Sequence, residues 1–323
     1  RHRSVSRGLG DVYKRQTLEC VIIYFDTLAQ KTPRRYKMNI LEIVTQGKPS
    51  LSFEVFPPKT QDNFESVMSA ATQIAKLHPS YMSVTYGAGG GTSKYTFDIC
   101  QTLSGMGITP LAHLTCVSST REKIHEELQS LKEHKIENIL ALRGDIPQGF
   151  DMSKISYRHA SELISEIAKD GGFCIGGACY PEGHPESPNS AADIDALKIK
   201  VDSGCEFLTT QMFFDNNILY NFLYRIYRAG INVPVIAGIM PVTNAGQIKR
   251  LMSISCSALP QRFVRIVDRY GDNPAAMKQA GIAYATEQII DLYANGVNAV
   301  HVYSMNKPDV AAAIKANLTE IVS

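Results

Sequence analysis

The sequence lacks a long apolar run, and its cysteines form no metal-binding pattern. A membrane-spanning helix needs about 20 mostly apolar residues, whereas the nearest candidate, Val21–Phe25, is far shorter. Seven cysteines occur among 323 residues, and none belongs to a Cys-x-x-Cys pair. We therefore expect no metal site. The odd cysteine count and the missing secretory signal indicate reduced thiols in a cytoplasmic protein, where they serve as small apolar side chains.

The signatures of several common enzyme classes are also missing. Gly87–Gly91 does not follow the Gly-x-Gly-x-x-Gly spacing of a dinucleotide-binding loop, so we interpret this run as a turn. The sequence has no Gly-x-Ser-x-Gly nucleophile elbow and no Ser-His-Asp order. Lys59 and Lys307 lie near predicted strand ends. They leave Schiff-base chemistry, as in a lysine-dependent aldolase, as an alternative.

Charge is unevenly distributed along the chain, whose formal net charge is +2. Nine of its 33 Lys and Arg and three of its 31 Asp and Glu lie in residues 1–37. Residues 38–323 therefore carry 24 basic and 28 acidic residues, a net charge of −4. This mildly acidic body argues against nucleic-acid binding.

Residues 1–37 do not join the pattern that follows them. Arg1–Gln16 shows no periodicity, and Met38 resembles a natural start. We interpret residues 1–37 as a non-native or disordered head, and residues 38–323 as a single catalytic domain. The alternative is a transit peptide, since the head is rich in Arg. Its acidic residues Asp11, Glu19 and Asp26 and the lack of a clear amphipathic helix make that alternative weaker.

Short apolar runs rich in β-forming residues recur along residues 38–323. Most are continuous rather than alternating, as in parallel strands that are buried on both faces. The eight predicted strands are Leu51–Phe56, Tyr81–Tyr86, Pro110–Thr115, Asn138–Leu142, Phe173–Tyr180, Phe207–Met212, Val233–Ile239 and Ala299–Tyr303.

Amphipathic segments with helix-capping residues and terminal glycines lie between these runs. The predicted helices are Asp62–Leu77, Ser93–Met106, Thr120–His134, Arg158–Lys169, Ser190–Ser203, Asn217–Ala229, Thr243–Met252 and Pro274–Asn295, with further helix within Ser253–Gly271. Eight strand–helix units predict an α/β fold of the (β/α)8 TIM-barrel class. An open, doubly wound sheet is the alternative.

One carboxylate lies inside an apolar strand. Glu54 belongs to the run Ser52–Val55, which Pro57 and Pro58 terminate. A buried carboxylate needs a partner or a raised pKa, and a proton donor that works near neutral pH also needs a raised pKa. We therefore expect Glu54 to be a general acid with a raised pKa. The alternative is a strand-end glutamate that faces water or pairs with a basic residue.

Polar residues follow almost every predicted strand. In a barrel these positions share one rim, which is where active sites of this fold lie. Each residue alone has a structural explanation: His113 could be a satisfied core histidine, and Arg143 and Asp145 a simple ion pair. The rim set is Glu54, Thr85, Tyr86, His113, Arg143, Asp145, Tyr180, His184, Gln211 and Lys307.

Eight short motifs, in order along the chain, resemble those of the methylenetetrahydrofolate reductase family, in its bacterial single-domain form. They are Ser52–Lys59, Val84–Gly87, His113–Cys116, Leu142–Asp145, Tyr180–Glu186, Thr210–Asp215, Gly238–Val242 and Val302–Asn306. The resemblance implies a flavoprotein of one-carbon metabolism, on the route to methionine. It would reduce 5,10-methylenetetrahydrofolate to 5-methyltetrahydrofolate by ping-pong hydride transfer from NADH or NADPH through FAD.

The resemblance also implies residue roles. Glu54 matches the general acid, and Asp145 matches a carboxylate beside the flavin and the pterin. Positions that match flavin contacts are Thr85, Tyr86, His113, Arg143, Gly144, Asp145, Ala160, Tyr180, His184, Ser187, Asp193 and Lys200. Positions that match substrate contacts are Glu54, Asp145, Gln211, Gln247 and Lys307. The family further implies a homo-oligomer that binds small molecules, and some members need an electron-delivering partner subunit.

The chain departs from the family pattern at four positions. Ala196 and Ile199 stand where Asn and Arg are common on the phosphate or AMP side of FAD. Lys307 replaces an Arg, which removes bidentate carboxylate geometry, and Leu251 stands where a Phe often packs on the substrates. Since none of these positions is Glu54 or Asp145, we expect the chemistry to be retained.

Overall fold

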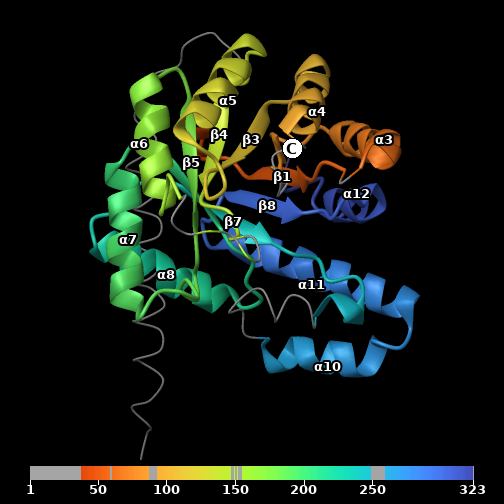
Figure 1. The fold of residues 1–323 in the computed structure, drawn as a ribbon. Helices are drawn as coiled ribbons and strands as arrows, with labels where there is room; N and C mark the ends of the chain where they lie inside the picture. The colour runs from red at the N-terminus through yellow and green to blue at the C-terminus, as the bar shows by residue number, and fades with distance from the viewer. Residues whose placement is uncertain are drawn as a thin grey trace, which may run out of the picture.

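The structure is a computed structural model (Figure 1). It describes residues 38–58, 60–86, 93–146, 149, 151, 155–248 and 259–322. The predicted head at residues 1–37, Lys59, the glycine run Gly87–Gly91 and Leu251 lie outside the described residues.

Eight parallel strands close into a barrel in which each strand pairs with its sequence neighbours and β8 pairs with β1. The strands are β1 (Ser50–Val55), β2 (Met82–Val84), β3 (Pro110–Thr115), β4 (Asn138–Leu142), β5 (Cys174–Cys179), β6 (Phe207–Thr210), β7 (Val235–Ile239) and β8 (Ala299–Tyr303). The closed ring confirms the barrel prediction and rules out the open sheet. β2 and β6 end earlier than predicted, so Thr85, Tyr86, Gln211 and Met212 belong to the loops that follow these strands.

Helices surround the barrel (Figure 1). They are α3 (Phe64–Ala75), α4 (Ser93–Gly105), α5 (Arg121–Glu133), α6 (Ala160–Asp170), α7 (Ser190–Asp202), α8 (Asn216–Arg228), α10 (Gln261–Tyr270), α11 (Pro274–Ala294) and α12 (Pro308–Ala316). Among the described residues, no helix is both long and apolar enough to cross a membrane. α12 was not predicted, and residues 61–63 form a separate 3-10 turn before α3 instead of its first turn.

A short helix closes the N-terminal end of the barrel. α2 (Ile40–Val44) begins with a capping box in which the Asn39 side chain accepts from the Glu42 amide. Its apolar face joins a buried cluster with Leu111 and Phe207. This helix was not predicted, because five residues give too short a pattern to show helical periodicity.

The barrel interior changes from apolar to polar along its axis. At the N-terminal end, Leu111 and Phe207 pack with α2. Farther along the same strands, alternate positions that share one face of each strand are occupied by Glu54, Ser83, His113 and His301. The mouth at the C-terminal ends of the strands is therefore lined by side chains that can exchange protons.

Two glycines let the mouth pack closely. A Cβ at Gly238 of β7 would lie 2.5 Å from the Tyr303 hydroxyl, so glycine leaves space for Tyr303 to reach the Thr210 carbonyl at 2.5 Å. Gly144, two residues after β4, has φ +84°, and its Cβ position lies 3.0 Å from Thr115. This left-handed conformation, which favours glycine, turns the chain between Arg143 and Asp145.

Candidate active site

Glu54 lies at the mouth of the barrel, with three polar side chains from neighbouring strands beneath it. Its Oε2 atom is 3.6 Å from His113 Nε2 on β3 and 3.9 Å from His301 Nε2 on β8. The Ser83 hydroxyl of β2 donates to the same oxygen at 3.4 Å. The Glu54 side chain keeps 19% of its surface exposed, while His113 and His301 are buried. Glu54 thus forms the boundary between the polar interior and the open mouth.

These neighbours determine the ionisation of Glu54. Burial raises the pKa of Glu54, but contact with His301, the charges of His113 and His301 and the Ser83 hydroxyl together outweigh burial and leave this pKa below its usual value. Burial lowers the pKa of His113 to about 4 despite the nearby carboxylate. His113 is therefore uncharged at neutral pH, where the contacts with His301 and the Ser83 hydroxyl remain to lower the pKa of Glu54.

The expected raised pKa of Glu54 is therefore wrong for this structure. The expectation treated Glu54 as a carboxylate in an apolar strand, and the flanking residues Phe53 and Val55 are indeed buried. However, β2, β3 and β8 bring polar partners to its other side, which a reading of one strand cannot show. The alternative that Glu54 pairs with basic residues describes its surroundings better.

The loop after β8 fixes the end of β1. Ser304 Oγ donates to the Glu54 carbonyl at 2.6 Å. The Asn306 side chain accepts from the Phe56 amide at 3.0 Å and donates to the Phe56 carbonyl at 2.9 Å. Met305 and Asn306 both have left-handed φ values, 54° and 53°, a conformation that costs free energy in non-glycine residues. The hydrogen bonds to β1 hold this turn and keep the backbone of Glu54 in place.

The predicted flavin contacts gather on one side of the mouth, from β2 to α7. Ser187 Oγ donates to Asp193 at 3.1 Å, and the His184 amide donates to the same carboxylate at 3.3 Å. The rings of Tyr180 and His184 meet edge to face, 4.6 Å apart. These four residues therefore form one connected group between β5 and α7.

The predicted cations on this side have partners within the chain. Arg143 forms a two-pronged ion pair with Glu186, at 2.6 and 2.7 Å. The Lys200 ammonium donates to the Ala178 carbonyl, and burial lowers the pKa of Lys200. Ala160 begins α6. The charges that would meet a phosphate are thus present, but they are engaged by Glu186 and by backbone.

The Tyr86 side chain does not point toward the other predicted flavin contacts. Thr85, directly after β2, still donates its backbone amide to the Val55 carbonyl of β1 at 3.0 Å. Its side chain therefore continues the inward side of Ser83, and the next side chain faces the opposite way. The Tyr86 hydroxyl donates to Glu127 of α5 at 3.4 Å, and its ring packs against the core between the barrel and the helices. The structure therefore places Thr85, but not the Tyr86 ring, at the mouth.

The two predicted folate contacts on the opposite side share one partner. Lys307 Nζ donates to Thr243 Oγ1 at 2.8 Å, and the Thr243 amide donates to Gln247 Oε1 at 3.2 Å. Gln211 follows β6, and its backbone amide donates to the Cys179 carbonyl of β5 at 2.7 Å. Asp145 is exposed, three residues beyond β4. The site therefore has a buried polar floor, a flavin-side group and a separate lysine–amide group.

Sequence reasoning missed several residues of this site. His301, Ser52 and Ser83 each interrupt an apolar strand, which is the signal that pointed to Glu54 and His113. Thr243 and Glu186 carry no such signal, because both lie in polar loops where their partners are known only from the fold.

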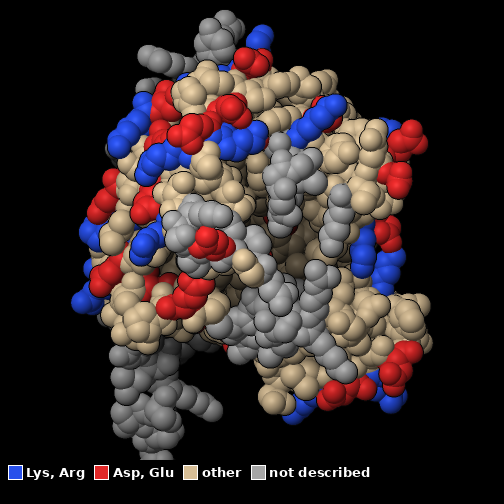
Figure 2. Space-filling view, viewed as in Figure 1, with Lys and Arg blue, Asp and Glu red and all other residues tan. Residues whose placement is uncertain are grey.

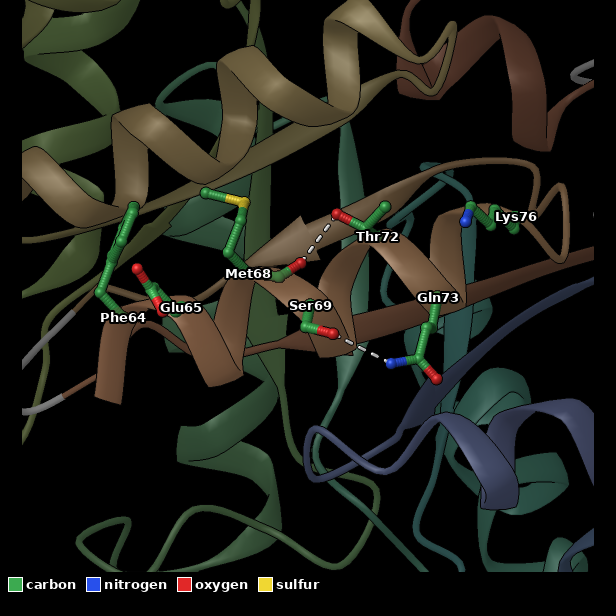
Figure 3. A pocket seen from close by; sticks show the side chains of 7 residues that line it. All are labelled: Phe64, Glu65, Met68, Ser69, Thr72, Gln73 and Lys76. Atoms are coloured by element: carbon green, nitrogen blue, oxygen red, sulfur yellow. Dashed lines mark hydrogen bonds between the residues drawn. The ribbon is translucent and has the colours of Figure 1, made fainter. Parts of the chain in front are cut away.

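Two surface clefts are lined by residues of the outer helices. One, of about 370 Å³, runs along the outer side of α3, where Phe64, Met68 and Gln73 line it (Figure 3). Another, of about 620 Å³, is lined by Arg121, Glu166 and other residues of α5, α6 and α7. The second cleft includes Ile199, one of the positions at which the chain departs from the family pattern, but neither cleft includes Glu54 or another residue of the rim set. Basic and acidic side chains are interspersed over the described part of the face in Figure 2.

In the part of the chain that the structure describes, no group of three or more His, Cys, Asp or Glu is arranged to hold a metal ion. Five cysteines in this part of the chain are buried and free of disulfides.

The residues at the mouth fit an organic cofactor. Within the described residues, His113 Nε2 is buried beside the Glu54 carboxylate and has no hydrogen-bond partner, so a polar ligand that reaches this atom would satisfy it. Aromatic, acidic and basic side chains flank this point on the β4–α7 side. A barrel with such a mouth belongs to the TIM-barrel enzymes, whose chemistry takes place at the C-terminal ends of the strands.

Comparison with known proteins identifies the family. The family model described as Methylenetetrahydrofolate reductase matches residues 39–319. The 5,10-methylenetetrahydrofolate reductase of Escherichia coli is 33% identical over 270 residues, which is 83% of this chain and 90% of the bacterial protein. The corresponding protein of Pectobacterium carotovorum is 34% identical with the same coverage. The chain therefore belongs to the methylenetetrahydrofolate reductase family and is an oxidoreductase.

Two further relatives differ in length or similarity. Methylenetetrahydrofolate reductase (NADH) 1 of Arabidopsis thaliana is 33% identical over 294 residues, 86% of this chain, but the chain spans only about half of the plant protein. A solved protein of Clostridium thermocellum, described as binding two copies of 5-methyl-5,6,7,8-tetrahydrofolic acid, has a TM-score of 0.56 and 13% identity. The match covers 87% of this chain and 97% of the solved chain, and this likeness supports the fold alone.

Proposed function

We propose that this chain reduces 5,10-methylenetetrahydrofolate to 5-methyltetrahydrofolate with electrons from NADH, through bound FAD in a ping-pong reaction. The observation that carries the proposal is the position of Glu54. A carboxylate at the mouth of the barrel rests on proton-exchanging side chains and keeps contact with solvent. Membership of the family supplies the substrate class, and NADH is named for a plant relative.

Bound FAD would supply the two-electron carrier that accepts hydride from the nicotinamide and passes hydride to the folate. The residues that would hold it are Thr85, His113, Arg143, Gly144, Asp145, Ala160, Tyr180, His184, Ser187, Asp193 and Lys200. His113 would donate or accept a hydrogen bond through its orphaned Nε2 atom. Arg143 and Lys200 would balance phosphate charge after giving up part of their present contacts.

Glu54 would protonate the folate nitrogen that leaves when the five-membered ring opens to an iminium. The lowered pKa of Glu54 in the open site opposes this role, and covering the mouth would raise that pKa. Ligands that remove the remaining 19% exposure of Glu54 add to the burial that already raises its pKa. Substrate binding would thus favour the protonated form at the moment when the proton is needed.

The other polar groups would orient the folate. Asp145, exposed beyond β4, would accept hydrogen bonds from the pterin, and Gln211 would contact either substrate. Lys307, held by Thr243, would bind a glutamate carboxylate of the folate with a single charge rather than a fork. Gln247 would support the same end of the substrate through Thr243.

The experiment that tests this function separates its two half-reactions. The purified chain should be yellow; NADH should bleach its flavin, and methylenetetrahydrofolate should restore the colour. Glu54→Gln should keep the first reaction within about twofold and slow the second by about 10²- to 10⁴-fold, the usual contribution of a general acid. Glu65→Gln, on the exposed side of α3, is the matched control and should change neither.

Three results would contradict the proposal or narrow it. A colourless protein that cannot be loaded with FAD would refute the cofactor. Equal loss of both half-reactions in Glu54→Gln would refute the role of Glu54 as an acid. A yellow protein that does not oxidise NADH with menadione as acceptor would show that a partner subunit must deliver the electrons.

A further inference from the structure

Three buried polar side chains continue from Glu54 into the barrel. The parallel register sets Ser52 of β1 opposite His301 of β8, and Glu54 opposite Ser83 of β2. Ser52 Oγ lies 2.7 Å from His301 Nδ1, and Ser83 Oγ lies 3.0 Å from His301 Nε2. Ser83 is also the residue that reaches Glu54, at 3.4 Å. The order Ser52–His301–Ser83–Glu54 is therefore continuous.

The hydrogens on this chain of contacts can be counted. The Ser52 hydroxyl donates to the Val300 carbonyl at 3.1 Å, so its single proton is used there. With the proton placed there, His301 Nδ1 is the donor in its contact with Ser52. Ser83 also has a single hydroxyl proton, which can go either to His301 Nε2 or to Glu54.

This limit leaves two arrangements with the same number of protons. In the first, His301 carries protons on both nitrogens, Nε2 donates to Ser83, and Ser83 donates to an ionised Glu54. In the second, Glu54 is protonated and donates to Ser83, which donates to the bare Nε2 of a neutral His301. The two differ only by the movement of protons along the hydrogen bonds.

We propose that His301 stores the proton that Glu54 gives to the folate and delivers it through the Ser83 hydroxyl. The inference rests on the proposed function. In the transfer, the Nε2–H bond of His301 breaks as an O–H bond forms on Ser83, and the original Ser83 O–H bond breaks as one forms on Glu54. Glu54 then loses this proton to the folate nitrogen, and no electrons change hands.

Burial gives the transfer its direction. Ser52 and Ser83 have no exposed surface and His301 has only 2%, so the chain of contacts reaches solvent through Glu54. In the open site, water at Glu54 favours the charged pair of imidazolium and carboxylate. When ligands cover Glu54, the surroundings become less polar, and separated charges become more costly than the neutral pair. Covering the mouth therefore moves the proton toward the substrate.

The side chains that face Glu54 and His301 are compatible with a proton held on His301. Tyr81, directly before β2, stacks on the His301 ring with the centroids 5.6 Å apart and an interplanar angle of 5°, and Tyr303 of β8 meets the ring edge to face. Burial raises the pKa of both phenols well above the ordinary value, so they stay neutral. His113 of β3, with its pKa of about 4, is neutral as well. The three side chains that face the pair therefore carry no charge near neutral pH.

The variants that test the proposal alter Ser83 and His301. Ser83→Ala removes the bridging hydroxyl, Ser83→Thr keeps it, and His301→Gln keeps a hydrogen bond without a store. The matched control is Thr209→Val, which removes another buried hydroxyl from β6, one without a hydrogen-bond partner among the described residues. Each protein is compared with the wild type in both half-reactions between pH 6 and 8.

Ser83→Ala and His301→Gln should slow folate reduction by about 10- to 100-fold at pH 7.5, the lower part of the range for proton-transfer groups. Flavin reduction by NADH should stay within twofold. The loss should shrink at pH 6, because Glu54 then takes protons directly from water. Ser83→Thr should recover most of the rate, and Thr209→Val should match the wild type. A Ser83→Ala rate within twofold of the wild type, a pH-independent loss, or an equal loss in Thr209→Val would overturn the proposal.

A second measurement does not depend on turnover. The ¹³C signal of the Glu54 carboxyl group, followed against pH, reports its pKa in the protein as purified. Ser83→Ala should raise that pKa, because the hydroxyl is one of the groups that lower it, and Thr209→Val should not. An unchanged Glu54 titration would refute the hydrogen-bonded connection even in an active enzyme. A wild type that binds no flavin or reduces no folate would instead refute the proposed function, and with it the role of this proton in catalysis. In that case a shifted Glu54 titration in Ser83→Ala would still show that the hydrogen-bonded connection exists.

Discussion

The two ends of the barrel interior are built by the same strands but have opposite chemistry. At the N-terminal end, Phe207 and Leu111 pack with α2 in a buried apolar cluster. At the C-terminal end, Glu54, His113 and His301 share a polar floor. Removing polar groups from water costs free energy unless they are paired, whereas burying apolar side chains stabilises the folded state. The comparison shows that one end stabilises the barrel while the other maintains groups that must change protonation.

The largest effect on stability is expected at the apolar end. Phe207 is fully buried, and its ring occupies the space where a Cβ on Gly176 would lie. Phe207→Ala should lower the free energy of unfolding by about 3–5 kcal/mol, the usual cost of such a cavity. Denaturant unfolding measures the loss. Phe207→Leu should cost clearly less, and a cost below 1 kcal/mol for Phe207→Ala would contradict the assignment of stability to this end.

Sequence and structure agree best where the pattern is long and local. All eight strands were predicted, because continuous apolar runs bounded by turns are a local signal. The predicted helix Thr120–His134 also agrees with α5 to one residue at each end, and Thr120 is its N-cap and accepts from the Lys123 amide. α2 was missed because it is only five residues long.

The site could be predicted less fully than the fold. Glu54 and His113 were found because each interrupts an apolar strand, and the structure brings them within 3.6 Å. The direction of the Glu54 pKa shift was wrong, because it depends on His301, which lies nearly 250 residues away in the chain. Side chains from distant strands set electrostatics, and a sequence pattern does not show their distances.

A second prediction tests the polar end on the folate side. Lys307→Met should raise the KM for methylenetetrahydrofolate by about tenfold with little change in kcat, since a contact remote from the reacting atoms contributes equally to substrate and transition-state binding. The measurement is steady-state kinetics with folates that carry one or several glutamates. Thr243→Val, which removes the partner of Lys307, should give a smaller rise. A fall in kcat without a change in KM would contradict this role.

The lowered pKa of Glu54 predicts how the polar end responds to acid. A carboxyl group whose pKa is lower in the folded than in the unfolded state contributes stability above its unfolded value, near 4.5. This contribution disappears as the pH falls through the lower, folded value. The melting temperature of the wild type minus that of Glu54→Gln should therefore decrease as the pH falls from 6 to 3. Glu65→Gln should show no such trend, and a difference that grows in acid would mean that the pKa is raised.

The smallest effect on stability is expected at the rim, where Arg143 and Glu186 form a partly exposed ion pair. Glu186→Gln should change the free energy of unfolding by less than about 1 kcal/mol, since such pairs are screened by water. The same variant should strengthen FAD binding severalfold, because Arg143 would then have no carboxylate to leave before it meets a phosphate. Fluorescence titration of flavin-free protein measures the affinity, with riboflavin, which lacks phosphate, as the matched ligand. If Glu186→Gln bound FAD more weakly, the carboxylate would be holding Arg143 in position rather than competing for it, and the rim would resemble the preformed floor around Glu54 more than a switchable contact.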